Sequence, residues 1–124
     1  ELLDLQHHRD ALVAGLPYGV RKVVELARAL CTDPKLLLLD EPSSGRNTEE
    51  TDDMAFWIRD IQQELGVTIL MVEHNMNVVS KIADTISVLQ RGQVIAEGPY
   101  AVVSQNPQVL EAYMGSATVL EGAH

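Results

Sequence analysis

An unbroken run of four leucines at residues 36–39 constrains the fold of this chain more than any other feature. Pro34 precedes the run and Asp40, Glu41 and Pro42 follow it, so the apolar segment is too short for a stable helix. Burying a leucine side chain is worth roughly 1.5–3 kcal/mol, against an ordering cost of about 1–2 kcal/mol per residue. We therefore expect a central strand of a parallel sheet that is covered on both faces.

Two adjacent carboxylates end this predicted strand. In parallel α/β sheets, ligands bind beyond the carboxyl ends of the strands, which is where Asp40 and Glu41 would emerge. Carboxylates there could hold a hydrated magnesium ion and polarise a water molecule, as nucleotide hydrolysis requires. The alternative is an ordinary solvated strand end. The polar loop and the capped helix that follow favour the catalytic interpretation.

The remaining sequence alternates between helix and strand patterns. A turn at residues 15–19 opens a helix whose apolar face ends at Cys31, which we expect to be buried. Residues 1–14 have the pattern of a frayed helix end. We expect further helices over residues 47–65, 76–83 and 106–113, strands over residues 67–72, 85–89 and 94–97, and a loose tail over residues 115–124. This alternation predicts an α/β fold with a parallel sheet and flanking helices.

The longest of these helices carries the clearest end signals. Asn47 is the expected N-cap, Glu50 completes a capping box, and Gly66 is the expected stop. Its apolar stripe has a helical period and comprises Met54, Trp57, Ile58, Ile61 and Leu65.

Composition excludes several classes of function. The chain has 124 residues with 46% hydrophobic content, which suits one globular domain or part of one. A formal net charge of −9 argues against a nucleic-acid partner. One cysteine permits neither an internal disulfide nor a cysteine metal cluster, and it fits a reducing compartment. No apolar stretch approaches the length of a membrane span.

Four motifs, in order and spacing, resemble the carboxyl-terminal half of an ABC transporter ATP-binding subunit, most closely the branched-chain amino acid importer type. They are Leu16-Pro17-Tyr18-Gly19, residues 25–30, Asp40-Glu41-Pro42 and Val72-Glu73-His74. The resemblance implies part of a P-loop NTPase fold of the ABC ATPase kind. It divides the chain into the end of a helical subdomain (residues 1–31), an α/β core (residues 32–97) and a carboxyl-terminal helix and tail (residues 98–124).

The resemblance implies catalytic roles for three side chains and the cofactors ATP and Mg²⁺. Asp40 would be the Walker B carboxylate that holds magnesium through water. Glu41 would be the general base, or would orient the attacking water. His74 would be the switch histidine that reaches the γ-phosphate.

The resemblance also implies two segments that face a second subunit. The signature turn, which would cap the γ-phosphate of ATP bound to that subunit, comprises Leu16, Tyr18, Gly19 and Val20. The loop that crosses to the partner comprises Ser43, Ser44, Gly45 and Asn47. Pro17 and Tyr18 stand where serine and glycine are usual in the signature, which predicts a reduced set of phosphate contacts.

The phosphate-binding loop of a complete ATPase is missing, because no Gly-Lys pair occurs among the eight glycines. We therefore expect little ATP binding or turnover by this chain alone. In the family, the phosphate-loop strand lies between the strand ending at His74 and the strand at residues 85–89. Without it, strand edges are unpaired and could pair with a second copy in a strand-swapped oligomer.

The leading interpretation is part of the ATP-hydrolysing subunit of an ABC importer for branched-chain or related amino acids. Its partners would be a second ATP-binding subunit and transmembrane permease subunits, on the cytoplasmic side of the plasma membrane. One alternative is a non-catalytic truncated module for dimerisation or interaction. Another is an ABC-type ATPase of DNA repair or cohesin, which the acidic charge and the Leu-Pro-Tyr-Gly turn disfavour.

Overall fold

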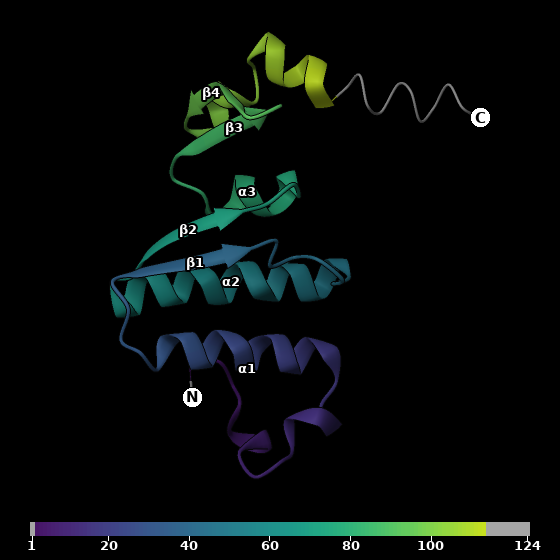
Figure 1. The fold of residues 1–124 in the computed structure, drawn as a ribbon, viewed down its shortest axis with the longest axis vertical. Coiled ribbons are helices and arrows are strands. Elements are labelled where there is room, and N and C mark those ends of the chain that lie inside the picture. The colour runs from purple at the N-terminus through teal and green to yellow at the C-terminus, as the bar shows by residue number, and fades with distance from the viewer. Residues whose placement is uncertain (1, 114–124) are drawn as a thin grey trace, which may run out of the picture. The chain divides into compact units, whose positions relative to one another are not determined.

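The computed structural model describes residues 2–113, and the chain divides between Val78 and Val79 into two compact units (Figure 1). The first unit contains 3-10 turns at Gln6–His8 and Val13–Gly15, helix α1 (Tyr18–Leu30), strand β1 (Leu36–Asp40), helix α2 (Thr48–Leu65) and strand β2 (Thr68–Val72). Helix α3 (Met76–Ile82) spans the division. The second unit contains strands β3 (Ile86–Gln90) and β4 (Gln93–Gly98), helix α4 (Tyr100–Val103) and a helical segment at residues 107–113.

Strands β1 and β2 form a parallel pair, which confirms that the two apolar segments are parallel strands of one sheet. The register runs from Leu36 opposite Thr68 to Asp40 opposite Val72. One more bond continues the pair, because the Glu41 amide donates to the Val72 carbonyl at 2.8 Å. Since the strands are parallel and in step, their carboxyl ends open at the same edge of the sheet.

One face of this sheet packs on the two long helices. Leu37 of β1 is 5% exposed and shares a core with Val23 of α1 and Ile61 of α2. Both helices present an apolar stripe to this core, as the 3.6-residue period predicted. Trp57 is half-buried against the same cluster, in agreement with a core role.

The opposite face of the sheet is uncovered. Leu36, Leu38, Leu70 and Val72 alternate along the two strands and are 53–65% exposed; we call these four residues the open face. The expectation that the leucine run is a central strand covered on both faces is therefore wrong for this chain. The reason is that β1 belongs to a two-stranded sheet, with α1 and α2 packed on one side only.

The ends of α2 follow the predicted signals. The Asn47 side chain accepts from the Glu50 amide at 2.8 Å, and the Glu50 carboxylate accepts from the Asn47 amide at 3.0 Å. These two bonds form a capping box. Gly66 ends the helix in the left-handed conformation, with φ of 63°. The buried stripe stops at Ile61, because Leu65 in the last turn is 51% exposed.

Two predictions near the amino terminus are wrong. Residues 1–14 form no helix end in the described part of the chain; two short 3-10 turns, separated by residues 9–12, lie there instead. Cys31 is exposed because it follows the last residue of α1, beyond the part of the helix that packs on the sheet.

The second unit is built on a hairpin. Strands β3 and β4 pair antiparallel, and Arg91 and Gly92 between them have φ of 51° and 79°. Positive φ at both turn residues is typical of tight hairpins whose turn matches the strand twist. Helix α4 contacts both strands, and Val103 and Val109 are almost fully buried in this unit.

Two of the predicted terminal features have different outcomes. The helix expected near residues 106–113 is present from residue 107. The predicted tail at residues 115–124 lies outside the described residues. Across the described part, no helix combines the length and apolar character needed to cross a membrane.

Candidate functional site

The carboxyl ends of β1 and β2 bring the predicted catalytic side chains to one edge of the sheet. Asp40 is the last residue of β1 and is exposed. Directly after it, a Glu41 carboxylate oxygen, Oε1, lies 3.4 Å from Nδ1 of His74. The Glu41 and His74 side chains are 49% and 70% exposed, so both are open to an incoming ligand. This is a carboxylate and an imidazole from two loops, facing each other at a solvent-accessible edge.

The backbone at Glu41 is held in an unusual conformation. Glu41 has φ of 45°, in the left-handed region that residues with a side chain seldom adopt. Such a residue costs on the order of 1–3 kcal/mol and persists where neighbouring bonds hold it. Two bonds do so: the Glu41 amide donates to Val72, and the Glu41 carbonyl accepts from the Ser44 amide at 3.0 Å.

The loop after the carboxylates, residues 43–47, is closed by its own hydrogen bonds. The Arg46 amide donates to the Ser43 carbonyl at 3.2 Å, and the Arg46 guanidinium donates to the Pro42 carbonyl at 3.1 Å. The Asn47 capping box then begins α2. Ser43 is buried, whereas Ser44, Gly45 and Asn47 are exposed. Another molecule can bind an ordered, exposed loop of this kind.

A residue that the sequence reasoning left without a role lies beneath this edge. The Glu73 side chain is 1% exposed and accepts hydrogen bonds from Ser43, His74 and Asn75. Burial raises the pKa of this carboxyl, but the hydrogen bonds from the Ser43 hydroxyl and from the three backbone amides outweigh it, and the pKa is lowered. The signal that could have found Glu73 is the one used for Asp40 and Glu41, a carboxylate directly after an apolar strand.

The predicted signature turn forms the start of α1. Pro17 is its N-cap with extended backbone, and the helix begins at Tyr18. The amides of Tyr18, Gly19 and Val20 therefore belong to the first turn, where backbone donors have no partner within the helix. Leu16 precedes the cap in extended backbone and is half-buried.

The signature turn and the loop at residues 43–47 meet in the same chain. A Cβ built on Gly45 would lie 3.2 Å from Cε1 of Tyr18, so the tyrosine ring covers this glycine. Gly45 has φ of 74°. Lys22 stands over the same ring, with Nζ 5.5 Å from its centroid. The sequence predicted that both segments face a partner subunit, but it did not predict that they contact each other.

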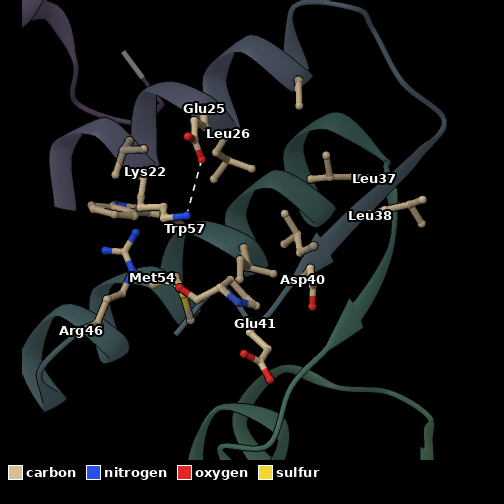
Figure 2. A pocket seen from close by; sticks show the side chains of 15 residues that line it. Lys22, Glu25, Leu26, Leu37, Leu38, Asp40, Glu41, Arg46, Met54 and Trp57 are labelled. Atoms are coloured by element: carbon tan, nitrogen blue, oxygen red, sulfur yellow. Dashed lines mark hydrogen bonds and ion pairs between the residues drawn. The ribbon is translucent and has the colours of Figure 1, made fainter. Parts of the chain in front are cut away.

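A pocket lies beside the strand end, between α1, β1 and α2 (Figure 2). Its volume is about 230 Å³, below the range of roughly 300–1,000 Å³ usual for sites of drug-sized ligands. Trp57, Leu26 and Met54 form much of its apolar wall, and Lys22 and Glu25 form an ion pair of 3.7 Å at its rim. The pocket by itself is too small to be assigned a nucleotide.

The donor set at the strand end suits a hydrated cation better than a protein-caged one. No group of three or more histidine, cysteine, aspartate or glutamate side chains converges on a metal site within residues 2–113. Asp40 and Glu41 are adjacent, exposed carboxylates. Magnesium usually keeps several waters and binds through one or two carboxylates together with substrate phosphates, so these residues fit it.

Two families of known proteins match parts of the chain. A family described as "ABC transporter" matches residues 1–44, and one described as "Branched-chain amino acid ATP-binding cassette transporter" matches residues 93–118. The first match ends within the loop that follows Asp40 and Glu41.

Curated relatives match nearly the whole chain. The high-affinity branched-chain amino acid transport ATP-binding protein BraF of Pseudomonas aeruginosa is 38% identical over 117 residues, which is 94% of this chain and 46% of BraF. The corresponding protein LivG of Escherichia coli is 36% identical over the same shares. The methionine import ATP-binding protein MetN 2 of Paraburkholderia xenovorans is 41% identical over 87% of this chain and 28% of its own length. The chain therefore spans about half the length of BraF and LivG.

Solved structures share the fold. The ADP conformation of MJ1267, an ATP-binding cassette of an ABC transporter, superimposes with a TM-score of 0.83 at 34% identity, over 92% of this chain and 46% of MJ1267. The structure of cbiO1 from Clostridium perfringens, part of the ABC transporter complex cbiONQ, has a TM-score of 0.78 at 27% identity, over 98% of this chain and 49% of its own.

Proposed function

Because the chain belongs to the family of ABC transporter ATP-binding subunits and resembles their carboxyl-terminal half, we propose that it supplies the hydrolytic strand ends of such a subunit. The transported solutes in this proposal are branched-chain or related amino acids, because BraF and LivG carry that description. The observation that carries the proposal is the Glu41–His74 pair, 3.4 Å apart at the shared edge of two parallel strands.

In this proposal, each residue at the edge has a distinct task. Glu41 orients the attacking water and accepts its proton, since its carboxylate is exposed and its backbone is held by neighbouring bonds. His74, 3.4 Å away, donates to the γ-phosphate of ATP. Asp40 holds magnesium through water, and the bound ion neutralises phosphate charge.

The second subunit in this proposal approaches the surface made by the signature turn and the loop at residues 43–47. Free amides at the start of α1 suit an anionic phosphate group. Permease subunits at the inner face of the plasma membrane would complete the importer. A phosphate-binding loop would come from the part of a BraF-type subunit that the match with this chain does not cover.

The proposal is tested by recombining halves. The chain is mixed with the purified amino-terminal half of BraF, and phosphate release from magnesium-ATP is measured. We expect turnover only when both halves are present, and we expect Glu41→Gln to lower the rate by about 10²–10⁴-fold. Glu64→Gln, an exposed change of the same chemistry on α2, serves as the control. Turnover that persists in Glu41→Gln would contradict the assigned role.

One observation favours a second candidate, a non-catalytic interaction module. The open face is an apolar surface on a sheet of two strands in the described part of the chain, and the outer edge of each strand is unpaired there; such edges recruit partners. In that case the recombined halves would associate without Glu41-dependent turnover. A strand-swapped oligomer of the chain alone would appear as a dimer in light scattering.

A further inference from the structure

Glu73 is a buried carboxylate that the proposed hydrolytic roles do not use. It follows β2 directly, between the strand and His74. Its side chain is 1% exposed, whereas those of Glu41 and His74 are 49% and 70% exposed. A carboxylate so enclosed cannot reach a nucleotide that binds at the surface, so any contribution to chemistry must act through other residues.

The two oxygens of Glu73 bind two different loops. Oε2 accepts from the Ser43 amide at 3.1 Å, in the loop that follows β1. Oε1 accepts from the amides of His74 at 3.1 Å and Asn75 at 3.3 Å, in the loop that follows β2. The Ser43 hydroxyl is a further donor. One side chain therefore joins the segments that begin at the two strand ends.

The hydrogen bonds of Glu73 link the two segments at the point where the backbone hydrogen bonds between β1 and β2 end. The last backbone bond between the strands runs from the Glu41 amide to the Val72 carbonyl. One residue beyond the end of β2, the Glu73 side chain makes the next link, to the Ser43 amide in the loop after β1. Beyond it, α3 is started by Asn75, whose side chain accepts from the amides of Asn77 and Val78.

A buried charge of this kind is stable only where donors surround it. Every buried side-chain polar atom within residues 2–113 has a hydrogen-bond partner. The donors to Glu73 include backbone amides, whose positions are set by the conformation of the two loops. Backbone donors aimed at one anion fix the chain more firmly than exposed side-chain pairs do.

We propose that Glu73 is a positioning residue that fixes the spacing between the loops carrying Glu41 and His74. The proposal rests on the proposed function for its effect on turnover, but its structural part stands without it. Catalytic groups lose much of their effect when displaced by about 1 Å. A buried carboxylate that is hydrogen-bonded to both loops is suited to prevent such a displacement.

The test replaces Glu73 by glutamine, which keeps the shape of the side chain and turns one acceptor oxygen into a donor. Facing the amide donors, that group cannot make the same bonds. In the recombined halves, we expect kcat to fall about tenfold while KM for magnesium-ATP changes less than about twofold. Glu64→Gln is the matched control. The proposal would be overturned if Glu73→Gln only reduced the amount of folded protein and left kcat per folded molecule unchanged.

A second measurement uses the chain alone and does not need ATP hydrolysis. In amide-resolved NMR spectra, Glu73→Gln should shift the signals of Ser43, His74 and Asn75 and leave those of the hairpin residues in place. Unchanged signals at all three amides would overturn the proposal. If wild-type halves show no turnover while these shifts occur, the proposed function fails and the positioning role stands.

Ser43→Ala provides a check should Glu73→Gln fail to fold. It removes the hydroxyl donor and keeps the carboxylate and the backbone bond. We expect a smaller loss of kcat, about two- to threefold, with a shifted His74 amide signal. Wild-type kcat together with an unshifted His74 signal in Ser43→Ala would overturn the proposal.

Discussion

At the scale of single residues, the site depends on positions where the backbone or a side chain is held in an otherwise unfavourable state. Glu41 has positive φ, and Glu73 is a charge with almost no exposure. Each is compensated by specific neighbours: the bonds around Glu41 and the donors around Glu73. Such features concentrate at functional sites because they pre-set the geometry.

Gly45 should be the least replaceable glycine of the first unit. Gly45→Ala adds a methyl group 3.2 Å from the Tyr18 ring at a φ of 74°, so we expect a loss of about 1–3 kcal/mol in the free energy of unfolding. Gly66 also has positive φ, but no atom lies within 4 Å of an added Cβ, so Gly66→Ala should lower the free energy of unfolding by about 1 kcal/mol. Gly15→Ala, with nothing within 4 Å, should change stability little.

Urea denaturation of these three variants separates backbone strain from the ring contact. Equal losses at Gly45 and Gly66 would mean that the Tyr18 contact contributes nothing. A further variant, Gly45→Ala combined with Tyr18→Ala, should recover the part of the loss that the contact causes.

The lowered pKa of Glu73 predicts an acid-side dependence of stability. A carboxyl whose pKa is lower in the folded state binds fewer protons there, so its stabilisation is complete above its ordinary pKa of 4.5 and is lost as the pH falls through the lower folded-state value. Denaturation midpoints measured from pH 7 down through pH 4.5 and below should fall more in the wild type than in Glu73→Gln. Parallel curves for the two proteins would contradict this prediction.

At the scale of elements, the important contrast is between the two faces of the β1–β2 pair. Leu37 is 5% exposed against α1 and α2, while its neighbour Leu38 is 65% exposed on the open face. The same residue type in the same strand therefore contributes differently, because side chains alternate across a sheet. In the proposed function, another part of a complete subunit would cover the open face.

Leu37→Ala and Leu38→Ala form a matched pair for this contrast. We expect Leu37→Ala to lower the free energy of unfolding of the chain by about 2–5 kcal/mol, because it leaves a cavity in the core. Leu38→Ala should cost less than about 1 kcal/mol. Circular dichroism during urea denaturation measures both, and equal losses would show that the open face is covered in solution.

The order of the two variants should be reversed when association with the amino-terminal half of BraF is measured instead of stability. Leu38→Ala is then expected to weaken the complex of the two halves, since its side chain lies on the surface available to a partner. Size-exclusion chromatography of the mixture would detect the loss, and undiminished association would argue that the partner binds elsewhere.

At the scale of the whole molecule, the sequence carries the exposed strand-end residues Asp40, Glu41 and His74 without a phosphate-binding loop. No glycine is followed by lysine anywhere in its sequence. The described residues also offer no multi-ligand metal cage. In the proposed function, two carboxylates and an imidazole would act on a bound nucleotide, but they offer few contacts with which to bind one.

We therefore expect the chain alone to bind magnesium-ATP weakly. Isothermal titration should show no saturable binding in the micromolar range, because the sequence contains no Gly-Lys pair of a phosphate-binding loop. The recombined halves should bind more tightly than either half. Micromolar affinity of the isolated chain would require phosphate contacts that are absent from the proposed arrangement.

Local sequence signals predicted much of this structure. The leucine run, the capping box at Asn47 and the stop at Gly66 were readable because they depend on short-range chemistry. The same holds for Asp40, Glu41 and His74, since polar residues that follow apolar strands of a parallel sheet emerge at one edge. The residue types and the strand period were sufficient for these predictions.

Only the tertiary structure decided the rest. That one face of β1 is open, that Tyr18 covers Gly45, and that Glu73 joins Ser43 to His74 all depend on contacts between segments distant in sequence. Burial and hydrogen bonding of a side chain are set by which segments meet around it, and the sequence records no distances between such segments. The sequence alone determined which residues could do chemistry; the packing determined which of them are held in place to do it.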